Sequence, residues 1–392
     1  SDVYKRQVYT ASAVSETGTE PAYRSLLDAS LGDDFLVGTD TEGMTFGPYI
    51  GRLADHASRL AVVRGMVMGS VAHNIATRHA LTGKQPAGTT VRCSSTAVTL
   101  ASLLGSAQTI PHLVGNVLTF NVGDPLWAAG VSTASLSDLH SMLLRGDPTL
   151  GDAQRDALEQ FFAEQRATNT AAMLEEIYET RLAARDIVEA DVAELFDLDA
   201  LTDLAAHFQI DSVRESSSGA ELALMAYQAL TNDISRCVSF AAATGLDAHD
   251  EDDWQGSHGP RQQDGFNAVA DLASALAQTP FGSSGDSWLD HTTIVLCSEF
   301  GRGALLNSAG GRDHGITNSC VLLGAGIRGG QVIGASSEVG MEAQAVDPKT
   351  GAVSPDGEFI TNEHIARTLL ASIGVEDDIN DYRVDPLPVL LS

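Results

Sequence analysis

The sequence has few basic residues and no long apolar run. Only 23 of its 392 residues are Lys or Arg, against 52 Asp and Glu, so the formal net charge is −29. An acidic excess of this size repels nucleic-acid phosphates and anionic membrane surfaces, so we expect neither as a partner. No stretch approaches the roughly 18 apolar residues that a membrane-spanning helix needs. With 43% hydrophobic residues, the chain has enough apolar side chains for the core of a folded protein.

Cysteine is also scarce, and its spacing does not suggest a metal site. None of the four cysteines, Cys93, Cys237, Cys297 and Cys320, belongs to a CxxC pair. Two of them lie inside apolar runs that resemble strands, which predicts buried free thiols. Disulfides are the alternative if the protein is exported, but their pairing cannot be read from a sequence.

The N-terminal segment follows no secondary-structure pattern. It starts without Met, lacks a charged-then-apolar signal segment, and its first ten residues, SDVYKRQVYT, match neither a strand nor a helix period. We therefore expect residues 1–10 to be a non-native or disordered leader on a chain whose true beginning is missing.

From residue 11 onward, short β-branched runs alternate with longer amphipathic stretches. This order predicts an α/β fold with a mostly parallel central sheet flanked by helices. Strands are expected at 60–66, 112–120, 237–245, 292–298 and 319–325. Helices are expected near 48–58, 73–83, 96–105, 262–278 and 362–373, the last with Thr361 as its N-cap. Residues 152–231 have helical periodicity and predict a helical insertion in a single domain that spans residues 11–392.

Polar side chains gather just after the predicted strands, where open α/β sheets usually carry their functional sites. Asp247 and His249 form an Asp-x-His pair after one strand, and alternation along an extended segment puts both on one side. Glu299 and Arg302 follow another strand. Three further residues, Arg312, Asp313 and His314, stand between glycines in the sequence GGRDHG at 310–315, and His73 follows the first strand.

Mixed imidazole and carboxylate ligands predict a divalent metal site. Such sets suit zinc, manganese or iron, and calcium is an alternative if the carboxylates dominate. Glycines on both sides of Asp313 and His314 permit backbone angles that turn both side chains inward. The simpler interpretation is that Asp313 forms a turn, His314 is a loop residue, and the acidic run at 250–253 is a solvated surface. Three strand-end loops that each carry His or a carboxylate favour the metal site.

Several stretches resemble one known family. The run HTTIVLCSEFGRGALLNSAGGRDHGITNSCVLLGAGIRGGQVIGAS is similar to the C-terminal signature of the family called domain of unknown function 1501, which belongs with the alkaline phosphatase and sulfatase superfamily. The stretches VVRGMVMGSVAHNIATRHALTGKQP, GLDAHD and ITNEHIARTLLASIGVEDD resemble it as well. The resemblance implies an alkaline phosphatase-like fold and a twin-arginine export signal, and hence a periplasmic or secreted protein. The chain lacks that signal and the Gly-Gly-x-x-His-x-Asp segment that follows it in the family.

The resemblance also implies a two-metal site. Asp247, His249 and His314 would hold one ion, with Asp313 as a further candidate ligand. Glu299 would contribute to the second ion, although Phe300 stands where a His ligand would be. His73 falls where the superfamily has its nucleophile, and Thr77 is the nearest hydroxyl.

These observations predict a metal-dependent hydrolase of phosphate or sulfate esters, with a small molecule or a glycan ester as its substrate. In this interpretation, Arg302 and Arg312 bind the anionic oxygens of the ester, and His73 is an extra ligand or a general acid. The alternative is a non-catalytic exported protein that binds metal or a sulfated glycan. A phosphomutase is a third possibility, but it lacks a convincing Ser or Thr nucleophile.

Overall fold

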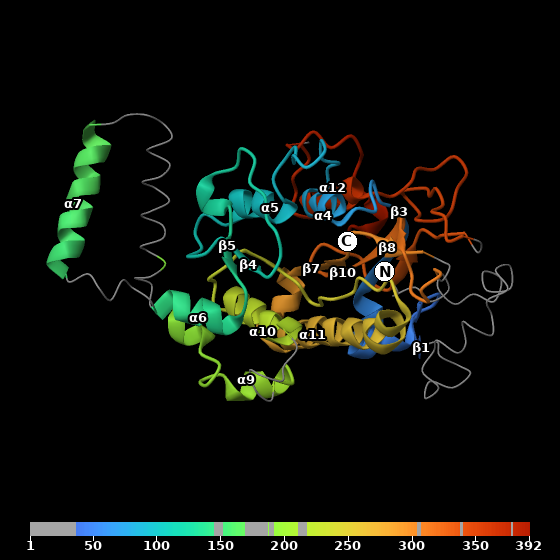
Figure 1. Cartoon of the computed structure of the whole chain (residues 1–392), viewed down its shortest axis with the longest axis horizontal. Coiled ribbons are helices and arrows are strands. Elements are labelled where there is room, and N and C mark those ends of the chain that lie inside the picture. The colour runs from blue at the N-terminus through green and yellow to red at the C-terminus, as the bar shows by residue number, and fades with distance from the viewer. Residues whose placement is uncertain are drawn as a thin grey trace. The chain divides into compact units, whose positions relative to one another are not determined.

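The structure is a computed structural model that describes residues 37–144, 152–168, 187, 192–210, 218–303, 307–337, 340–377 and 379–392 (Figure 1). The predicted leader at 1–10 lies outside these residues. The chain divides into two compact units, one made of Ser1–Thr96 with Ala242–Ser392 and the other of Ala97–Ala241. Each unit combines helices with a sheet, so the protein is a mixed α/β protein, while the single domain spanning 11–392 stays a prediction. No helix among the described residues is both long and apolar enough to cross a membrane.

The first unit is built on a four-stranded sheet in the order β11-β3-β10-β7. Its strands are β3 (Leu60–Val67), β7 (Thr293–Cys297), β10 (Thr317–Gly324) and β11 (Gln331–Ile333). β11 is parallel to β3, but β10 is antiparallel to both β3 and β7. A mostly parallel central sheet is therefore not confirmed.

The direction of β10 follows from its connection to β7. A parallel return needs a crossover, usually through a helix. The described residues between β7 and β10 contain instead a short antiparallel ribbon of β8 (Gly301–Arg302) and β9 (His314–Gly315). This ribbon turns the chain back beside β7 and forms part of the candidate site.

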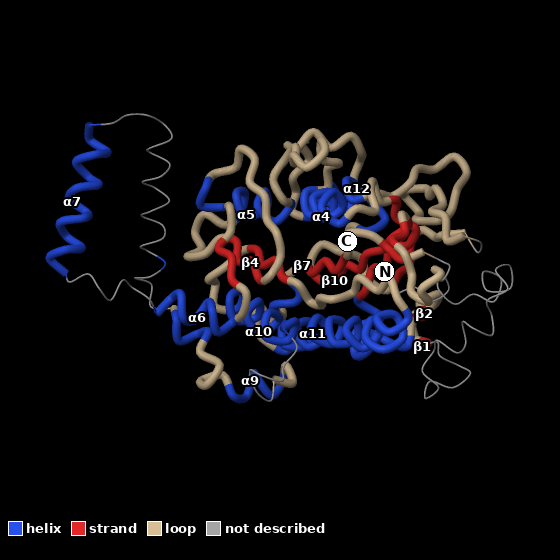
Figure 2. The backbone as a smooth tube through the Cα atoms, viewed as in Figure 1, coloured by secondary structure: helices blue, strands red, loops and turns tan. Residues whose placement is uncertain are grey.

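Both faces of this sheet are buried, which explains the continuous apolar runs of its strands. On one face, Val63 and Leu322 pack with Ala76 of α4 (His73–Thr82) and Ile365 of α12 (Asn362–Ser372). On the other, Val62, Val321 and Leu323 pack against η2 (Pro48–Arg59) and α11 (Gly259–Gln278). Figure 2 shows α11 on the opposite side of β7 and β10 from α4 and α12. The predicted Thr361 cap is present as a capping box with His364.

The first unit also contains short peripheral elements. They are β1 (Val37–Gly38) and β2 (Thr45–Phe46), which pair antiparallel, the π-helical η5 (Asp252–His258), and the 3₁₀ turns η6 (Trp288–His291) and η7 (Pro388–Leu390). Among these, η5 leads directly into α11 and packs beside the candidate site.

The second unit contains a parallel three-stranded sheet in the order β5-β4-β6. Its elements are α5 (Thr96–Leu104), β4 (His112–Gly115), η3 (Leu126–Ala128), β5 (Val131–Thr133), α6 (Leu136–Leu144), α7 (Asp152–Thr168), η4 (Ala193–Phe196), α9 (Thr202–His207), α10 (Ser218–Thr231) and β6 (Cys237–Phe240). Gly115 lets β4 approach α10 closely, since a Cβ there would lie 2.7 Å from Leu222. The described residues within 152–231 form α7, η4, α9 and α10, and their being an insertion in a single domain stays a prediction.

Candidate metal centre

The candidate site lies at one edge of the four-stranded sheet, where four segments of the first unit meet. β3 and β7 run in the same direction, so the segments that follow them, which carry His73 and Glu299, leave the sheet at the same edge. β10 begins at that edge because it is antiparallel to both, and the ribbon before it carries Arg302 and His314. Asp247 comes from the segment that precedes η5. The sheet topology therefore brings these side chains together.

The glycines of GGRDHG allow the loop at 310–315 to lie in close contact with the segment at 248–251. Gly310 has a φ of +81°, and a Cβ on Gly311 would lie 2.2 Å from the carbonyl carbon of His249. The Arg312 amide donates to the Ala248 carbonyl at 3.0 Å, and the Glu251 amide donates to the Ala309 carbonyl at 3.0 Å. The two glycines are thus required for close backbone contact, and this contact fixes the positions of His249 and His314 relative to each other.

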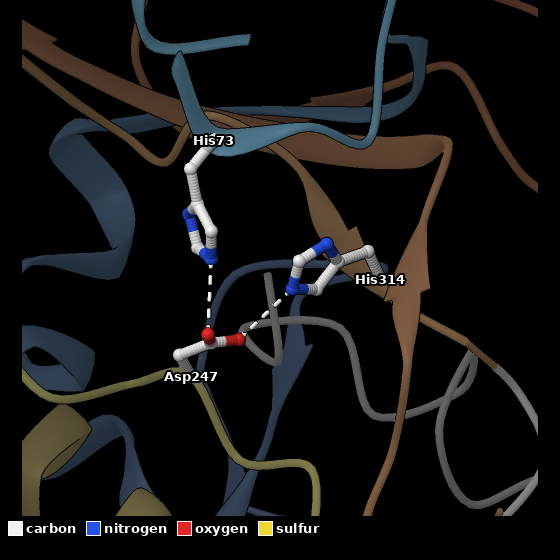
Figure 3. Close-up of side chains that lie close together, drawn as sticks. All are labelled: His73, Asp247 and His314. Carbon is white, nitrogen blue, oxygen red and sulfur yellow. Dashed lines mark hydrogen bonds and ion pairs between the residues drawn. The ribbon is translucent and has the colours of Figure 1, made fainter.

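Asp247 is the centre of the side-chain cluster (Figure 3). Its Oδ2 lies 3.0 Å from His73 Nε2, and its Oδ1 lies 2.9 Å from both His249 Nε2 and His314 Nε2. Arg302 Nη2 donates to the same Oδ1 at 2.7 Å. One ligand atom each from His73, Asp247 and His314 lie within 4.8 Å of one another. These three residues form the group that could share an ion, and His249 lies beside it, in contact with Asp247 and His314.

The opposite nitrogen of each imidazole faces an acceptor. Nδ1 of His73 lies 2.8 Å from Glu299 Oε1, and Nδ1 of His249 lies 3.0 Å from Asp313 Oδ1. Nδ1 of His314 lies 2.6 Å from the Val71 carbonyl oxygen. Because a carbonyl or an ionised carboxylate can only accept, these contacts hold a proton on Nδ1 of each ring. Nε2 of His73 and His314 faces Asp247, and a metal ion bound there would take the place of the Nε2 proton, as in metal-binding histidines.

The electrostatics of the carboxylates favour their ionised forms. Burial alone would raise the pKa of Asp247, but hydrogen bonds from Arg302, His314 and His73 outweigh it and hold that pKa well below its ordinary value. Hydrogen bonds from Asn307 and His249 likewise lower the pKa of Asp313. Both side chains are therefore anionic at neutral pH, which is the form that binds metal.

Apolar and cationic neighbours hold the imidazoles in place. The Phe300 ring is buried and lies 4.1 Å from the ring of His314 and 4.7 Å from that of His73, measured between centroids. Arg302 is also buried, and its guanidinium donates to the carbonyls of Leu246 and Arg312 as well as to Asp247. Arg302 therefore fixes the carboxylate of Asp247, and Phe300 packs against the rings of His73 and His314.

Comparison with known proteins decides the family. The model of the family described as "Protein of unknown function (DUF1501)" matches residues 15–350. The chain belongs to this family. No curated protein and no solved structure matches the chain. All the residues of the cluster fall within the matched range.

In this DUF1501 protein, the residues predicted as ligands occupy two layers. Asp247, His249 and His314 lie at the centre, and His73 joins them. Glu299 and Asp313 lie farther from this centre. Glu299 contacts Nδ1 of His73, and Asp313 contacts Nδ1 of His249. A further residue, Asn307, donates to Asp313 and to the His249 carbonyl, a role that its place in the sequence does not reveal.

Arg312 does not reach the cluster. Its side chain is fully buried, donates to the Gly303 carbonyl at 2.7 Å, and lies 4.9 Å from the centroid of the Trp254 ring. In the described structure, Arg312 therefore supports the loop that carries His314 and is not placed to bind an anionic ligand. Sequence reasoning missed this role because arginines are seldom fully buried.

Proposed function

We propose that the cluster around Asp247 binds a divalent transition metal ion. The observation that carries this proposal is the orientation of three histidines, whose Nδ1 atoms face acceptors while their Nε2 atoms face Asp247. In a tetrahedral zinc site with metal–ligand bonds of about 2.1 Å, neighbouring ligand atoms are roughly 3.4 Å apart. The separations of 2.9–3.0 Å around Asp247 need only small movements to reach this value.

The chemistry of these donors narrows the choice of metal. Imidazole nitrogens with one carboxylate suit zinc, manganese or iron, whereas calcium prefers oxygen ligands alone. His73, Asp247 and His314 would hold the ion, with His249 as a fourth ligand. Glu299, Asp313 and the Val71 carbonyl would orient the imidazoles, as acceptors behind metal-binding histidines do.

We further propose that the protein hydrolyses phosphate or sulfate esters and has an alkaline phosphatase- or sulfatase-like fold. The family resemblance and the placement of the cluster at a sheet edge support this. A bound divalent ion would polarise an ester oxygen and lower the pKa of a water. The chain itself offers the N-terminus of α4, where Ala72 provides no side-chain cap, so the first amides of the helix can donate hydrogen bonds to an anionic oxygen. His73, at the first position of that helix, is placed to orient a ligand or to move a proton at Nε2.

One observation favours the alternative of a binding protein without catalysis. Of the two arginines predicted to bind the ester, Arg312 is buried beside Trp254, and Arg302 is bound to Asp247 and two carbonyls. Neither guanidinium is therefore preformed to receive the oxygens of an ester. A protein that binds a metal ion without turning over an ester would not need this arrangement.

A hydrolysis assay separates the two functions. The protein, freed of metal by a chelator and reloaded with zinc, manganese or iron, would be assayed with para-nitrophenyl phosphate and para-nitrophenyl sulfate. An esterase releases nitrophenol only in the metal-loaded state, and His314→Ala lowers the rate at least about 100-fold, whereas His291→Ala, at an exposed histidine paired with Asp286, leaves it unchanged. Stoichiometric metal without release of nitrophenol from either ester would contradict the hydrolase and support the binding protein.

A further inference from the structure

Two of the four cysteines face each other across neighbouring strands. The antiparallel register of β7 and β10 places Cys297 directly opposite Cys320. Directly opposed side chains lie on the same face of a sheet. The next pair on this face, two residues along each strand, agrees, because Val295 and Leu322 pack in the same core cluster as Cys320. The two thiols are therefore neighbours on the face that α4 and α12 cover.

The backbone spacing of this pair suits a disulfide. Opposed residues of antiparallel strands have Cα atoms about 4.5 or 5.5 Å apart, depending on the hydrogen-bonding pattern. Disulfides join Cα atoms that are roughly 4.4 to 6.8 Å apart, so either pattern fits. The other cysteines are placed differently, since Cys237 stands opposite His112 in the second unit and Cys93 lies outside the strands.

We propose that Cys297 and Cys320 form a disulfide when the folded protein meets an oxidising pool of small disulfides. Cys297 is exposed and Cys320 is buried, so a molecule such as oxidised glutathione reaches Cys297 first. The Cys297 thiolate attacks one glutathione sulfur, forms a mixed disulfide and releases one glutathione thiolate. The Cys320 thiolate then attacks the Cys297 sulfur and releases the second. Two protein thiols thus lose two electrons and two protons, and oxidised glutathione becomes two glutathione thiols.

This disulfide would join the strands one residue before the turn that carries Glu299. Asn318 of β10 already holds that turn, because its Nδ2 donates to the Ser298 carbonyl at 2.8 Å, and Ser298 Oγ donates to the Phe300 carbonyl at 3.0 Å. A covalent link between Cys297 and Cys320 would restrain the same turn in the unfolded and folded chain alike. We therefore expect the oxidised protein to unfold at a higher temperature than the reduced protein.

Peptide mapping tests the proposal directly. The folded full chain is incubated in glutathione redox buffers of increasing oxidised fraction, at alkaline pH because burial raises the pKa of Cys297 to about 11 and that of Cys320 well above its ordinary value. Free thiols are then alkylated, and the protein is digested with trypsin without reduction. We expect a linked pair of peptides, 262–302 with 313–328, that vanishes on reduction. The link should be absent from Cys297→Ala and retained in Cys237→Ala.

A second measurement keeps the proposal testable if a variant folds poorly. The Tm of the wild-type chain should rise by several degrees on oxidation and return on reduction, and the Tm of Cys297→Ala should not respond. Alkylation of both Cys297 and Cys320 in every redox buffer, with the wild-type chain folded, would overturn the proposal. So would a link from Cys297 to any other cysteine. Neither the peptide map nor the Tm depends on a measurement of metal content. A negative result here therefore contradicts the disulfide and not the proposed function.

Discussion

The Nε2 atoms of His249 and His314 lie 2.9 Å apart, while the Nδ1 atom of each ring faces an acceptor. If both Nδ1 atoms carry the proton, the two Nε2 lone pairs point toward each other and repel. A cation between them removes this repulsion, and the carboxylate of Asp247 beside both rings adds a negative charge that attracts one. The close approach of these two histidines is therefore a second physical argument for a metal ion.

The carboxylates behind the histidines should set the strength of metal binding. Glu299→Ala and Asp313→Ala each remove the acceptor from one Nδ1, so that imidazole loses its fixed tautomer and orientation. We expect each variant to bind zinc about 10- to 100-fold more weakly, as measured by competition with a chelator. Glu299→Gln keeps an acceptor oxygen and should lose less. Asp356→Asn, at an exposed carboxylate in the same unit, is the control, and an equal loss in that variant would show that only net charge matters.

Gly311 should be essential for the position of His249. A Cβ at this position would lie 2.2 Å from the His249 carbonyl carbon and 2.3 Å from the Asp250 nitrogen, so the two loops must separate in Gly311→Ala. We expect this variant to lose metal affinity by at least about tenfold, since ligands displaced by even small distances bind poorly. Gly256→Ala is the matched control, because a Cβ at Gly256 meets no atom within 4 Å. Equal metal affinity in the two variants would contradict the account of the GGRDHG loop.

The buried Arg312 should stabilise the fold through its planar guanidinium. Lysine in its place cannot both stack on Trp254 and donate to the Gly303 carbonyl in the same way. Chemical denaturation of Arg312→Lys should show a free energy of unfolding lower by about 3 kcal/mol, a cost typical of a disrupted buried charge. Trp254→Phe keeps an aromatic face and should lose less than Trp254→Leu. If the two Trp254 variants are equally stable, the contact between the guanidinium and the ring contributes nothing.

Acid should destabilise the first unit through His79. Burial lowers the pKa of this side chain to about 4, and its ordinary value is 6.5. The unfolded chain therefore binds a proton that the folded chain does not, so stability is full above about pH 6.5 and falls as the pH drops toward 4. The shift corresponds to about 3 kcal/mol for this residue. The free energy of unfolding measured between these pH values should fall less steeply in His79→Gln, and an unchanged slope would exclude His79 as a cause.

The sequence predicts more of the site than of the sheet. Asp247, His249 and His314 could be singled out because polar residues after apolar runs are conspicuous, and the glycines of GGRDHG permit backbone angles that turn side chains inward. The close backbone contact at Gly311 is seen only in the structure. The direction of β10 could not be predicted, because an apolar run buried on both faces looks the same in parallel and antiparallel strands. Its orientation depends on the ribbon of β8 and β9, which has no strong strand pattern of its own.

The sequence also could not predict that the site has two layers. Glu299 and Asp313 are carboxylates at strand ends, just as Asp247 is, and their order along the chain does not tell which of them faces the centre and which lies behind an imidazole. The Val71 carbonyl is a backbone group that every residue possesses. Arg312 was predicted to bind the anionic oxygens of an ester, but it stacks on Trp254, and a contact between segments nearly sixty positions apart cannot be read from the sequence.

Elemental analysis of the purified protein tests the central claim most directly. The wild-type chain, the His314→Ala variant and the His291→Ala control would be dialysed against trace zinc, manganese and iron, and their metal content measured by mass spectrometry. We expect about one ion per chain in the wild type and in His291→Ala, and a loss of most of it in His314→Ala. Equal metal content in all three proteins, or none in the folded wild type, would contradict a metal centre at Asp247.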